Sequence, residues 1–151
     1  MKPIAIGADD AAFEFRNSIV EYLNNQRIEI IDYSSDKQSH NPLYPDVAHA
    51  VACSIKAGKH ERGILICGTG IGVAIAANKV PGIRAAQCHD IFSAERARKS
   101  NNAQIMTMGA RVIGIELAKK LVQAWLQSEF EGGGSTPKVE RINYYDELYS
   151  K

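Results

Sequence analysis

Residues 66–72 read ICGTGIG, with Cys67 at the end of an apolar run and glycines at positions 68, 70 and 72. An apolar run of strand length, a glycine-rich turn and a helical pattern form the repeating unit of parallel α/β sheets. Glycines lack Cβ, so the backbone N–H groups of such a turn can approach an anionic atom closely. The stretch therefore predicts either a tight strand-to-helix turn or an anion-binding loop, and both alternatives are open at this point.

The same unit recurs along the whole chain. Short apolar runs of strand length alternate with longer amphipathic stretches, and each run ends near Gly, Asp or Cys. The expected strands are 3–8, 28–33, 63–68, 83–88 and 104–109. This alternation predicts an α/β fold in which helices cover both faces of a five-stranded parallel sheet.

Helical spacing is clearest between these runs and after the last of them. Apolar residues recur every three to four positions over 13–23, 47–55 and, most regularly, 115–130. A final amphipathic stretch at 138–149 follows the glycine run 132–134 and has no later strand to return to. We therefore expect residues 135–151 to form a C-terminal extension that packs on a partner subunit.

Composition limits the classes of function. The 151 residues are 45% hydrophobic, which suits a single domain spanning 1–151. Basic and acidic residues are balanced, 18 against 17, so no nucleic acid or membrane partner is expected. No apolar run is long enough to span a membrane, and the N-terminus turns polar too soon for a signal peptide. We expect a cytoplasmic protein.

Cysteine and histidine spacing gives no sign of a metal centre. The three cysteines are scattered and lack C-x-x-C spacing, so we expect free thiols, with Cys53 and Cys88 as small buried side chains. The four histidines lack metal-ligand spacing and are expected to be surface or hydrogen-bonded residues: His40, His49, His60 and His89. No metal and no cofactor are expected.

Candidate site residues follow from where the strands end. Open α/β sheets bind ligands outside the carboxyl ends of their strands, which here are followed by residues 9–10, 67–72, 88–90 and 109–111. A thiol at a helix N-terminus is readily ionised, so Cys67 is a candidate base or nucleophile, and the hydroxyl of Thr69 could reach the same ligand. Asp9 and Asp10 could bind a metal or sugar hydroxyls, or cap a helix starting at Ala11.

Other readings of the glycine loop fit less well. A dinucleotide fingerprint needs G-x-G-x-x-G after the first strand, whereas this loop reads G-x-G-x-G after the third, and no G-K-[ST] of a P-loop follows. Among the cations, Arg111 stands just beyond a strand end, where it could bind an anion. Arg96, Arg98 and Lys99 are expected to form a solvated helix face.

Taken together, several stretches resemble the ribose-5-phosphate isomerase B family, which includes the galactose-6-phosphate isomerases. The resemblance runs through nearly the whole chain and rests on residues 7–9 (GAD), 66–86 (ICGTGIGVAIAANKVPGIRAA), 100–104 (SNNAQ), 109–114 (GARVIG) and 124–133 (AWLQSEFEGG). It implies a Rossmann-like, metal-free aldose–ketose isomerase of a phosphorylated sugar. It also implies a homodimer or homotetramer whose sites lie between subunits.

The resemblance further implies a role for each matching residue. Cys67 would be the base that moves a proton between C1 and C2 through a cis-enediolate, and Thr69 would move a proton between O1 and O2. The backbone of residues 68–72, formed by Gly68, Thr69, Gly70, Ile71 and Gly72, would stabilise the enediolate. Asp9 and Asn101 would bind the sugar, and Arg111 the phosphate.

The chain also departs from the family pattern. Asp10 and Ser100 stand where the ribose-5-phosphate isomerases usually have histidines. In those enzymes, the histidine that corresponds to Ser100 opens the furanose ring. Residues 132–138 read GGGSTPK instead of GGRHxxR, which leaves Gly134 and Lys138 in place of two arginines. We expect Lys138, with Arg111, to bind the phosphate.

The loss of the ring-opening histidine bears on the substrate. A tetrose 4-phosphate has no free hydroxyl with which to close a five-membered ring, so its isomerase needs no ring-opening group. This favours erythrose 4-phosphate and erythrulose 4-phosphate as the substrate pair. The alternatives are a ribose 5-phosphate isomerase in which His89 opens the ring, and a sugar-phosphate-binding module without catalysis.

Overall fold

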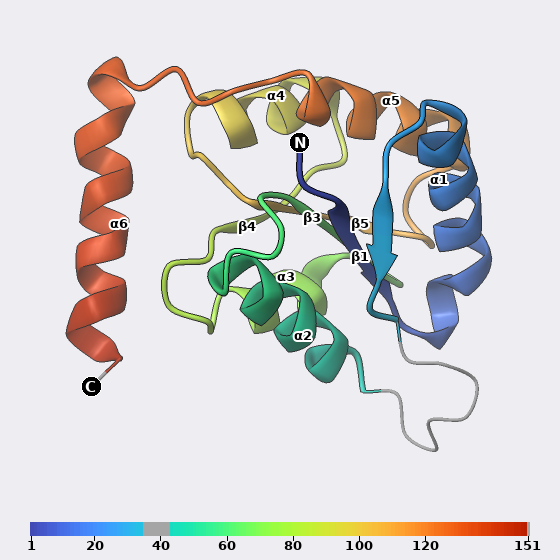
Figure 1. The fold of residues 1–151 in the computed structure, drawn as a ribbon, viewed down its shortest axis with the longest axis horizontal. Helices are drawn as coiled ribbons and strands as arrows, with labels where there is room; N and C mark the ends of the chain where they lie inside the picture. The colour runs from blue at the N-terminus through green and yellow to red at the C-terminus, as the bar shows by residue number, and fades with distance from the viewer. Residues whose placement is uncertain (35–42, 151) are drawn as a thin grey trace.

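A five-stranded, all-parallel sheet forms the centre of the computed structural model, which describes residues 1–34 and 43–150 (Figure 1). The strand order is β2-β1-β3-β5-β4. The strands are β1 Ile4–Ala8, β2 Ile30–Asp32, β3 Gly63–Cys67, β4 Ala85–Gln87 and β5 Ile105–Gly109. Each expected strand forms, slightly shortened at its ends, which confirms the predicted sheet.

Helices cover both faces of the sheet, as expected for this class of fold. One face is covered by α1 Phe13–Asn25, α4 Ile91–Lys99 and α5 Ile115–Leu126, and the other by α2 Tyr44–Lys56 and α3 Ile71–Ala77. Short 3₁₀ turns at Asp10–Ala12 and Gly133–Ser135 precede α1 and the C-terminal helix α6, Thr136–Tyr149. The α/β sandwich with a C-terminal helix is therefore confirmed.

The alternation of side chains along β3 divides the core into two parts. Ile64 and Ile66 pack with α1, α4 and α5, whereas Leu65 and Cys67 pack with α2 and α3. Successive side chains of a strand point to opposite faces, and every residue of β3 is buried, so the strand is apolar throughout. The last residue of this strand, Cys67, consequently faces the side of the sheet on which α3 begins.

Arg98 corrects one expectation about charge on the surface. Its side chain is only 7% exposed, although the run 96–99 was expected to be solvated. The guanidinium donates to Asn102 Oδ1 at 3.1 Å and to the carbonyl of Ala103 at 2.9 Å. Arg98 is buried because it pairs with the turn that joins α4 to β5, a contact that charge spacing alone does not reveal.

The cysteines are free, as expected, but they differ in burial. Cys88 is buried, and that burial raises the pKa of its thiol to about 12, so it stays protonated at neutral pH. Cys53 is half-buried on α2, and its sulfur lies 3.4 Å from His49 Nε2. Cys53 is therefore less buried than expected, because the side of α2 on which it lies is partly exposed to solvent.

Arg62 anchors the end of α5 to the start of β3. Its guanidinium, 7% exposed, donates to the carbonyls of Trp125, Leu126 and Ser128 at 2.8–3.0 Å. It also pairs with Glu129 at 2.6 Å. The last carbonyls of a helix have no partner within the helix. Trp125 O also accepts the N–H of Ser128 at 3.2 Å, whereas Arg62 is the donor described for the carbonyls of Leu126 and Ser128.

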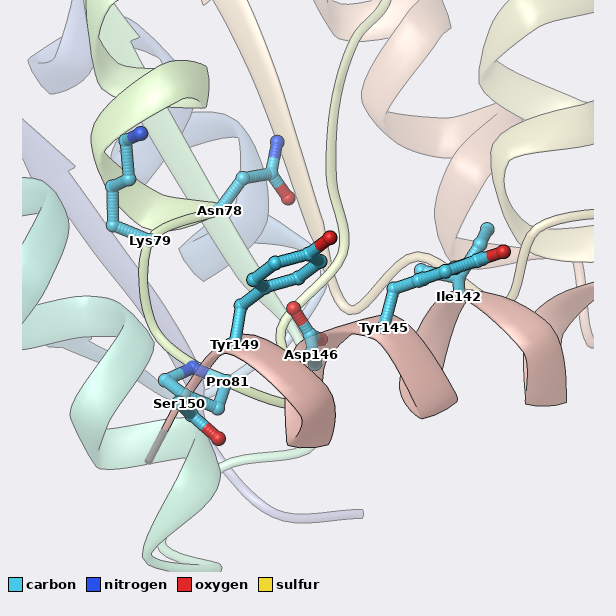
Figure 2. A pocket seen from close by; sticks show the side chains of 8 residues that line it. All are labelled: Asn78, Lys79, Pro81, Ile142, Tyr145, Asp146, Tyr149 and Ser150. Carbon is cyan, nitrogen blue, oxygen red and sulfur yellow. The ribbon is translucent and has the colours of Figure 1, made fainter.

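The C-terminal helix α6 stands at the side of the molecule, away from the sheet (Figure 1). An open groove of about 700 Å³ separates it from residues 78–81, and Figure 2 shows Tyr145 and Tyr149 on the side of α6 that faces Asn78. Several apolar side chains of α6 remain exposed: Ile142, Tyr144, Tyr145, Leu148 and Tyr149. None of the helices in the described part of the chain is long and apolar enough to cross a membrane.

We expect Arg62→Met to lower the free energy of unfolding by about 3 kcal/mol, because it leaves buried carbonyls without a donor. Urea denaturation at a fixed protein concentration measures this loss. Lys119→Met is the matched control, since it removes a partly exposed ion pair with Glu116 that is worth less than about 1 kcal/mol. Equal losses in the two variants would contradict the role given to Arg62.

Candidate active site

Three loops meet at the carboxyl edge of the sheet, after the adjacent strands β1, β3 and β5. Their backbones are joined directly: Asp9 N–H donates to the carbonyl of Ile66 at 3.3 Å, and Ala110 N–H donates to that of Cys67 at 2.9 Å. Arg111 N–H donates to the carbonyl of Gly68 at 3.0 Å. The chain changes direction between β1 and β3 in the strand order, which is where such sheets form a ligand crevice.

Cys67 lies at the centre of this crevice. Its side chain is 5% exposed, and its sulfur accepts a hydrogen bond from the N–H of Gly70 at 3.1 Å. The helix α3 begins at Ile71, so the sulfur faces backbone N–H groups at a helix start, as the sequence predicted. This arrangement places the partial positive charge of the helix start beside the sulfur of Cys67.

Two glycines allow the loop 68–72 to lie against β5. Gly70 has a φ of +77°, and a Cβ there would come within 2.7 Å of the Met108 carbonyl carbon. A Cβ on Gly109 would come within 2.6 Å of the Thr69 backbone. Because both clashes are with backbone atoms, side chains at these positions would push the loop away from β5.

Side chains from β4 and β5 hold the same loop from behind. Thr107 Oγ1 donates to the carbonyl of Gly70 at 2.6 Å, and Gln87 Nε2 donates to that of Thr69 at 2.7 Å. The hydroxyl of Thr69 accepts from the N–H of Ile71 at 3.2 Å, which leaves its own proton free to donate. Gln87 and Thr107 were missed from the sequence, because only the strand order brings them to the loop.

Asp9, Asp10 and Arg111 bring charge to the edge of the crevice. Burial raises the pKa of Asp9, the neighbouring charge of Asp10 raises it further, and Arg111 acts in the opposite direction. Asp9 Oδ1 is buried and has no hydrogen-bond partner among the described residues. The capping alternative, offered for one of Asp9 and Asp10, is not supported at Asp9, whose side chain makes no capping hydrogen bond to the turn Asp10–Ala12. Its Oδ1 remains available to a ligand.

Arg111 is exposed, and its side chain lies over Gly68. The position of a Cβ on Gly68 would be 3.5–3.7 Å from Arg111 Cδ, Nη1 and Nε. A small residue at position 68 therefore leaves room for this cation above the loop. The guanidinium borders the same crevice as Cys67 and Asp9, where it can meet an anionic ligand.

The His89 imidazole is neutral and accepts a hydrogen bond through one ring nitrogen. Its Nε2 accepts the N–H of Gly109 at 3.0 Å. Burial lowers the pKa of His89 against the opposing pull of Asp90, so the imidazole is uncharged at neutral pH. Among the other histidines, His60 is buried and bonded to Tyr33 and the carbonyl of Pro3, as expected, and His40 lies outside the described residues.

Tyr44 forms a wall that sequence spacing did not reveal. Its ring, on the first turn of α2, packs directly on Gly72 at the start of α3. Any side chain at position 72 would overlap the ring, which gives the third glycine of the loop a packing reason. The contact depends on how α2 docks beside α3, so no local pattern marks Tyr44.

Ser100, Asn101 and Lys138 lie away from Cys67. Ser100 and Asn101 follow α4 and precede β5, whose first residue pairs with Gly63 at the amino edge of the sheet. The five residues of β3 span about 13 Å, so Cys67 is at the opposite edge. The described part of one chain therefore holds two groups of predicted site residues that do not meet.

The hydroxyl of Ser100 is held by charged neighbours. Arg96 Nε donates to Ser100 Oγ at 2.7 Å, and Arg96 Nη1 pairs with Glu131 at 3.0 Å. Glu131 N–H in turn donates to the carbonyl of Lys99 at 3.1 Å, which draws the segment before α6 to the end of α4. Asn101 and Lys138 are both exposed, and Lys138 lies in the first turn of α6, shortly after Glu131.

In residues 1–34 and 43–150, no three His, Cys, Asp or Glu side chains gather as a metal site. The groups at the carboxyl edge are instead a thiol, backbone donors, two carboxylates and a guanidinium. Such a set can abstract a proton and stabilise the oxyanion that results.

Comparison with known proteins agrees with this chemistry. The chain is 63% identical over 146 residues to the D-erythrulose-4-phosphate isomerase of Pectobacterium atrosepticum, covering 97% of this chain and 96% of that protein. It is 51% identical to the ribose-5-P isomerase B of Listeria innocua, covering 95% and 97%.

The fold has the same relatives. The ribose-5-phosphate isomerase B of Clostridium thermocellum superposes with a TM-score of 0.93 at 41% identity, covering 99% of this chain and all of that one. The sequence model of the Ribose/Galactose Isomerase family matches residues 4–142. With the sheet, the glycine loop and the thiol at its start all in place, the chain belongs to the ribose/galactose isomerase family.

Proposed function

We propose that this protein interconverts erythrose 4-phosphate and erythrulose 4-phosphate, with Cys67 as the base. The observation that carries the proposal is the thiol of Cys67 facing the N–H of Gly70, at an edge that also holds Asp9 and Arg111. Three free cysteines suit a reducing compartment, and we assign the enzyme to the cytoplasm.

The reaction moves one proton between neighbouring carbons. The Cys67 thiolate removes the proton from C2 of the aldose, the electrons move to O1 as an enediolate, and the same proton returns to C1 to give the ketose. Backbone N–H groups of residues 68–72 stabilise the oxyanion, and the free proton of the Thr69 hydroxyl is available to pass between O1 and O2. The open Oδ1 of Asp9 suits a sugar hydroxyl.

A complete site needs two copies of the chain. Asn101 and Lys138 can join Cys67, Asp9 and Arg111 around one substrate only if a second subunit brings its amino edge to the first subunit's carboxyl edge. The exposed apolar face of α6 supports such packing, and we propose a homodimer, or a homotetramer built from it, with α6 packed on the partner. Lys138 and Arg111 then hold the phosphate from two sides.

Position 100 favours the tetrose. A pentose 5-phosphate closes through O4 into a furanose, and opening that ring is proton-transfer work suited to histidine near neutral pH. The Ser100 hydroxyl cannot replace it, and its oxygen is engaged by Arg96. The relative at 63% identity is named an erythrulose 4-phosphate isomerase, which supports a substrate that reaches the site without a ring.

Cys67→Ser is expected to lower kcat by about 10²–10⁴, the usual contribution of a positioned base, because a serine hydroxyl stays protonated at neutral pH. Steady-state assays with erythrose 4-phosphate measure the effect. Cys53→Ser is the matched control and should keep near wild-type turnover, since Cys53 lies on α2 beside His49. Normal turnover in Cys67→Ser would remove Cys67 from the mechanism.

Two inactive variants should rescue each other if the site is shared. In a refolded mixture of Cys67→Ser and Asn101→Ala, half the dimers are mixed and each contains one intact site, so activity should return to about one quarter of wild type. The separate variants supply the baseline. Activity that stays at the mean of the two separate variants would place the whole site within one chain.

Substrate preference separates the tetrose from the pentose. We expect kcat/KM for erythrose 4-phosphate to exceed that for ribose 5-phosphate, because the tetrose needs no ring opening. A preference for ribose 5-phosphate would refute this assignment, and its loss in His89→Ala would then point to His89 as the ring-opening group. For a tetrose enzyme, Ser100→His should change kcat/KM for erythrose 4-phosphate little.

A further inference from the structure

Arg84, the residue before β4, binds two segments distant in sequence with one guanidinium. Its Nε lies 3.2 Å from the carbonyls of both Asn101 and Asn102, and its Nη2 donates to the carbonyl of Asn102 at 3.0 Å. Its Nη1 donates to Asn143 Oδ1 on α6 at 2.8 Å and reaches the carbonyl of Gly82 at 3.4 Å. All three guanidinium nitrogens are therefore used.

The first of these segments is a tight turn that carries Asn101. Asn102 has a φ of +49°, an uncommon conformation for a residue with a side chain, and its carbonyl is the one that Arg84 binds twice. Gln104 Oε1 accepts the N–H of Arg84 at 2.8 Å, so the turn and Arg84 hold each other through backbone and side chain. The direction in which the Asn101 side chain leaves the turn depends on this contact.

The second segment is α6, which buries Val139 but makes few polar contacts with the rest of its own chain. Besides Arg84 to Asn143, the polar link described is Gly82 N–H to Asp146 Oδ2 at 2.9 Å, and an open groove runs beside the helix. Lys138 lies five residues before Asn143, which is about 7.5 Å along a helix axis. Moving Asn143 therefore moves Lys138 with it.

We propose that Arg84 is a positioning residue that fixes the spacing between Asn101, which binds the sugar, and Lys138, which binds the phosphate. The inference rests on the proposed function and adds to it a residue that touches no substrate. A four-carbon substrate sets one distance between its hydroxyls and its phosphate. A single rigid guanidinium holding both elements keeps that distance constant, whereas a lysine in its place offers no planar fork.

Double-mutant cycles in kcat/KM for erythrose 4-phosphate test the proposal. Arg84→Gln alone should lower kcat/KM by about 10²-fold, as a displacement of about 1 Å at a site can do. Because it acts through Asn101 and Lys138, adding Arg84→Gln to the double variant Asn101→Ala/Lys138→Gln should cost less than threefold more, roughly the scatter of independent substitutions. If Arg84→Gln lowers kcat/KM by the same factor in the double variant as in wild type, the positioning role is wrong.

Two further variants guard against a loss of folding. Asn143→Ala cuts only the link to α6, so it should raise KM in wild type and leave KM unchanged in a Lys138→Gln background. Arg84→Lys keeps the positive charge but lacks the planar guanidinium. Compared with Arg84→Gln, it should restore the melting temperature but not kcat/KM. Recovery of both by lysine would show that Arg84 only stabilises the fold. Arg27→Gln, an exposed arginine in the turn after α1, is the control and should change neither quantity.

Binding of 4-phosphoerythronate, a carboxylate analogue of the substrate, separates this inference from the proposed function. Isothermal calorimetry on the same variants should show the same non-additive pattern in Kd whether or not turnover occurs. A wild-type protein that binds this analogue without isomerising the sugar would refute the function alone. Additive losses in Kd would refute the positioning role alone, and absence of binding to wild type would refute both.

Discussion

The candidate site depends on direct backbone contact between the loop 68–72 and β5. Gly70 and Gly109 allow this approach, and a Cβ at either position would collide with backbone atoms that cannot move aside. The contact turns the N–H of Gly70 towards the sulfur of Cys67 and lets Ala110 and Arg111 bond to the carbonyls of the same loop. The proposed base, oxyanion donors and cation are therefore placed by one close approach of two backbone segments.

The parallel sheet also separates the candidate site residues into two groups at its opposite edges. Loops after β1, β3 and β5 supply reactive groups at one edge, while the turn after α4 and the start of α6 supply Ser100, Asn101 and Lys138 at the other. A strand of five residues keeps these edges about 13 Å apart, which is farther than a four-carbon substrate reaches. In the dimer that we propose, two chains joined edge to edge would bring these groups together, and the placement of α6 would then serve catalysis as well as assembly.

Periodicity and turn chemistry predicted the strands, most helices and the groups after β1, β3 and β5, because these features are local or follow from parallel topology. The role offered for Asn101 came from a resemblance, whereas the position of Cys67 at a strand end already made it a candidate base. Both roles remain proposals. Local patterns did not reveal the burial of Arg98, the ring of Tyr44 on Gly72, or the contacts of Arg84 with both the turn 101–102 and α6. Each of these depends on how segments distant in sequence pack, and a single charged or aromatic residue looks the same in sequence whether it meets solvent or a neighbour.

The separation of the two edges gives a physical reason why relatives with one fold can carry different substrate names. Proteins 51% and 63% identical to this chain are named for a pentose and a tetrose phosphate. A change at position 100 alters a turn that Arg96 and Arg84 hold at the amino edge, and it leaves the hydrogen bonds around Cys67 untouched. Proton transfer between C1 and C2 is the same for either sugar, so that machinery can stay fixed. Under the proposed function, substrate discrimination falls to the amino edge, because ring opening and the distance to the phosphate differ between the two sugars.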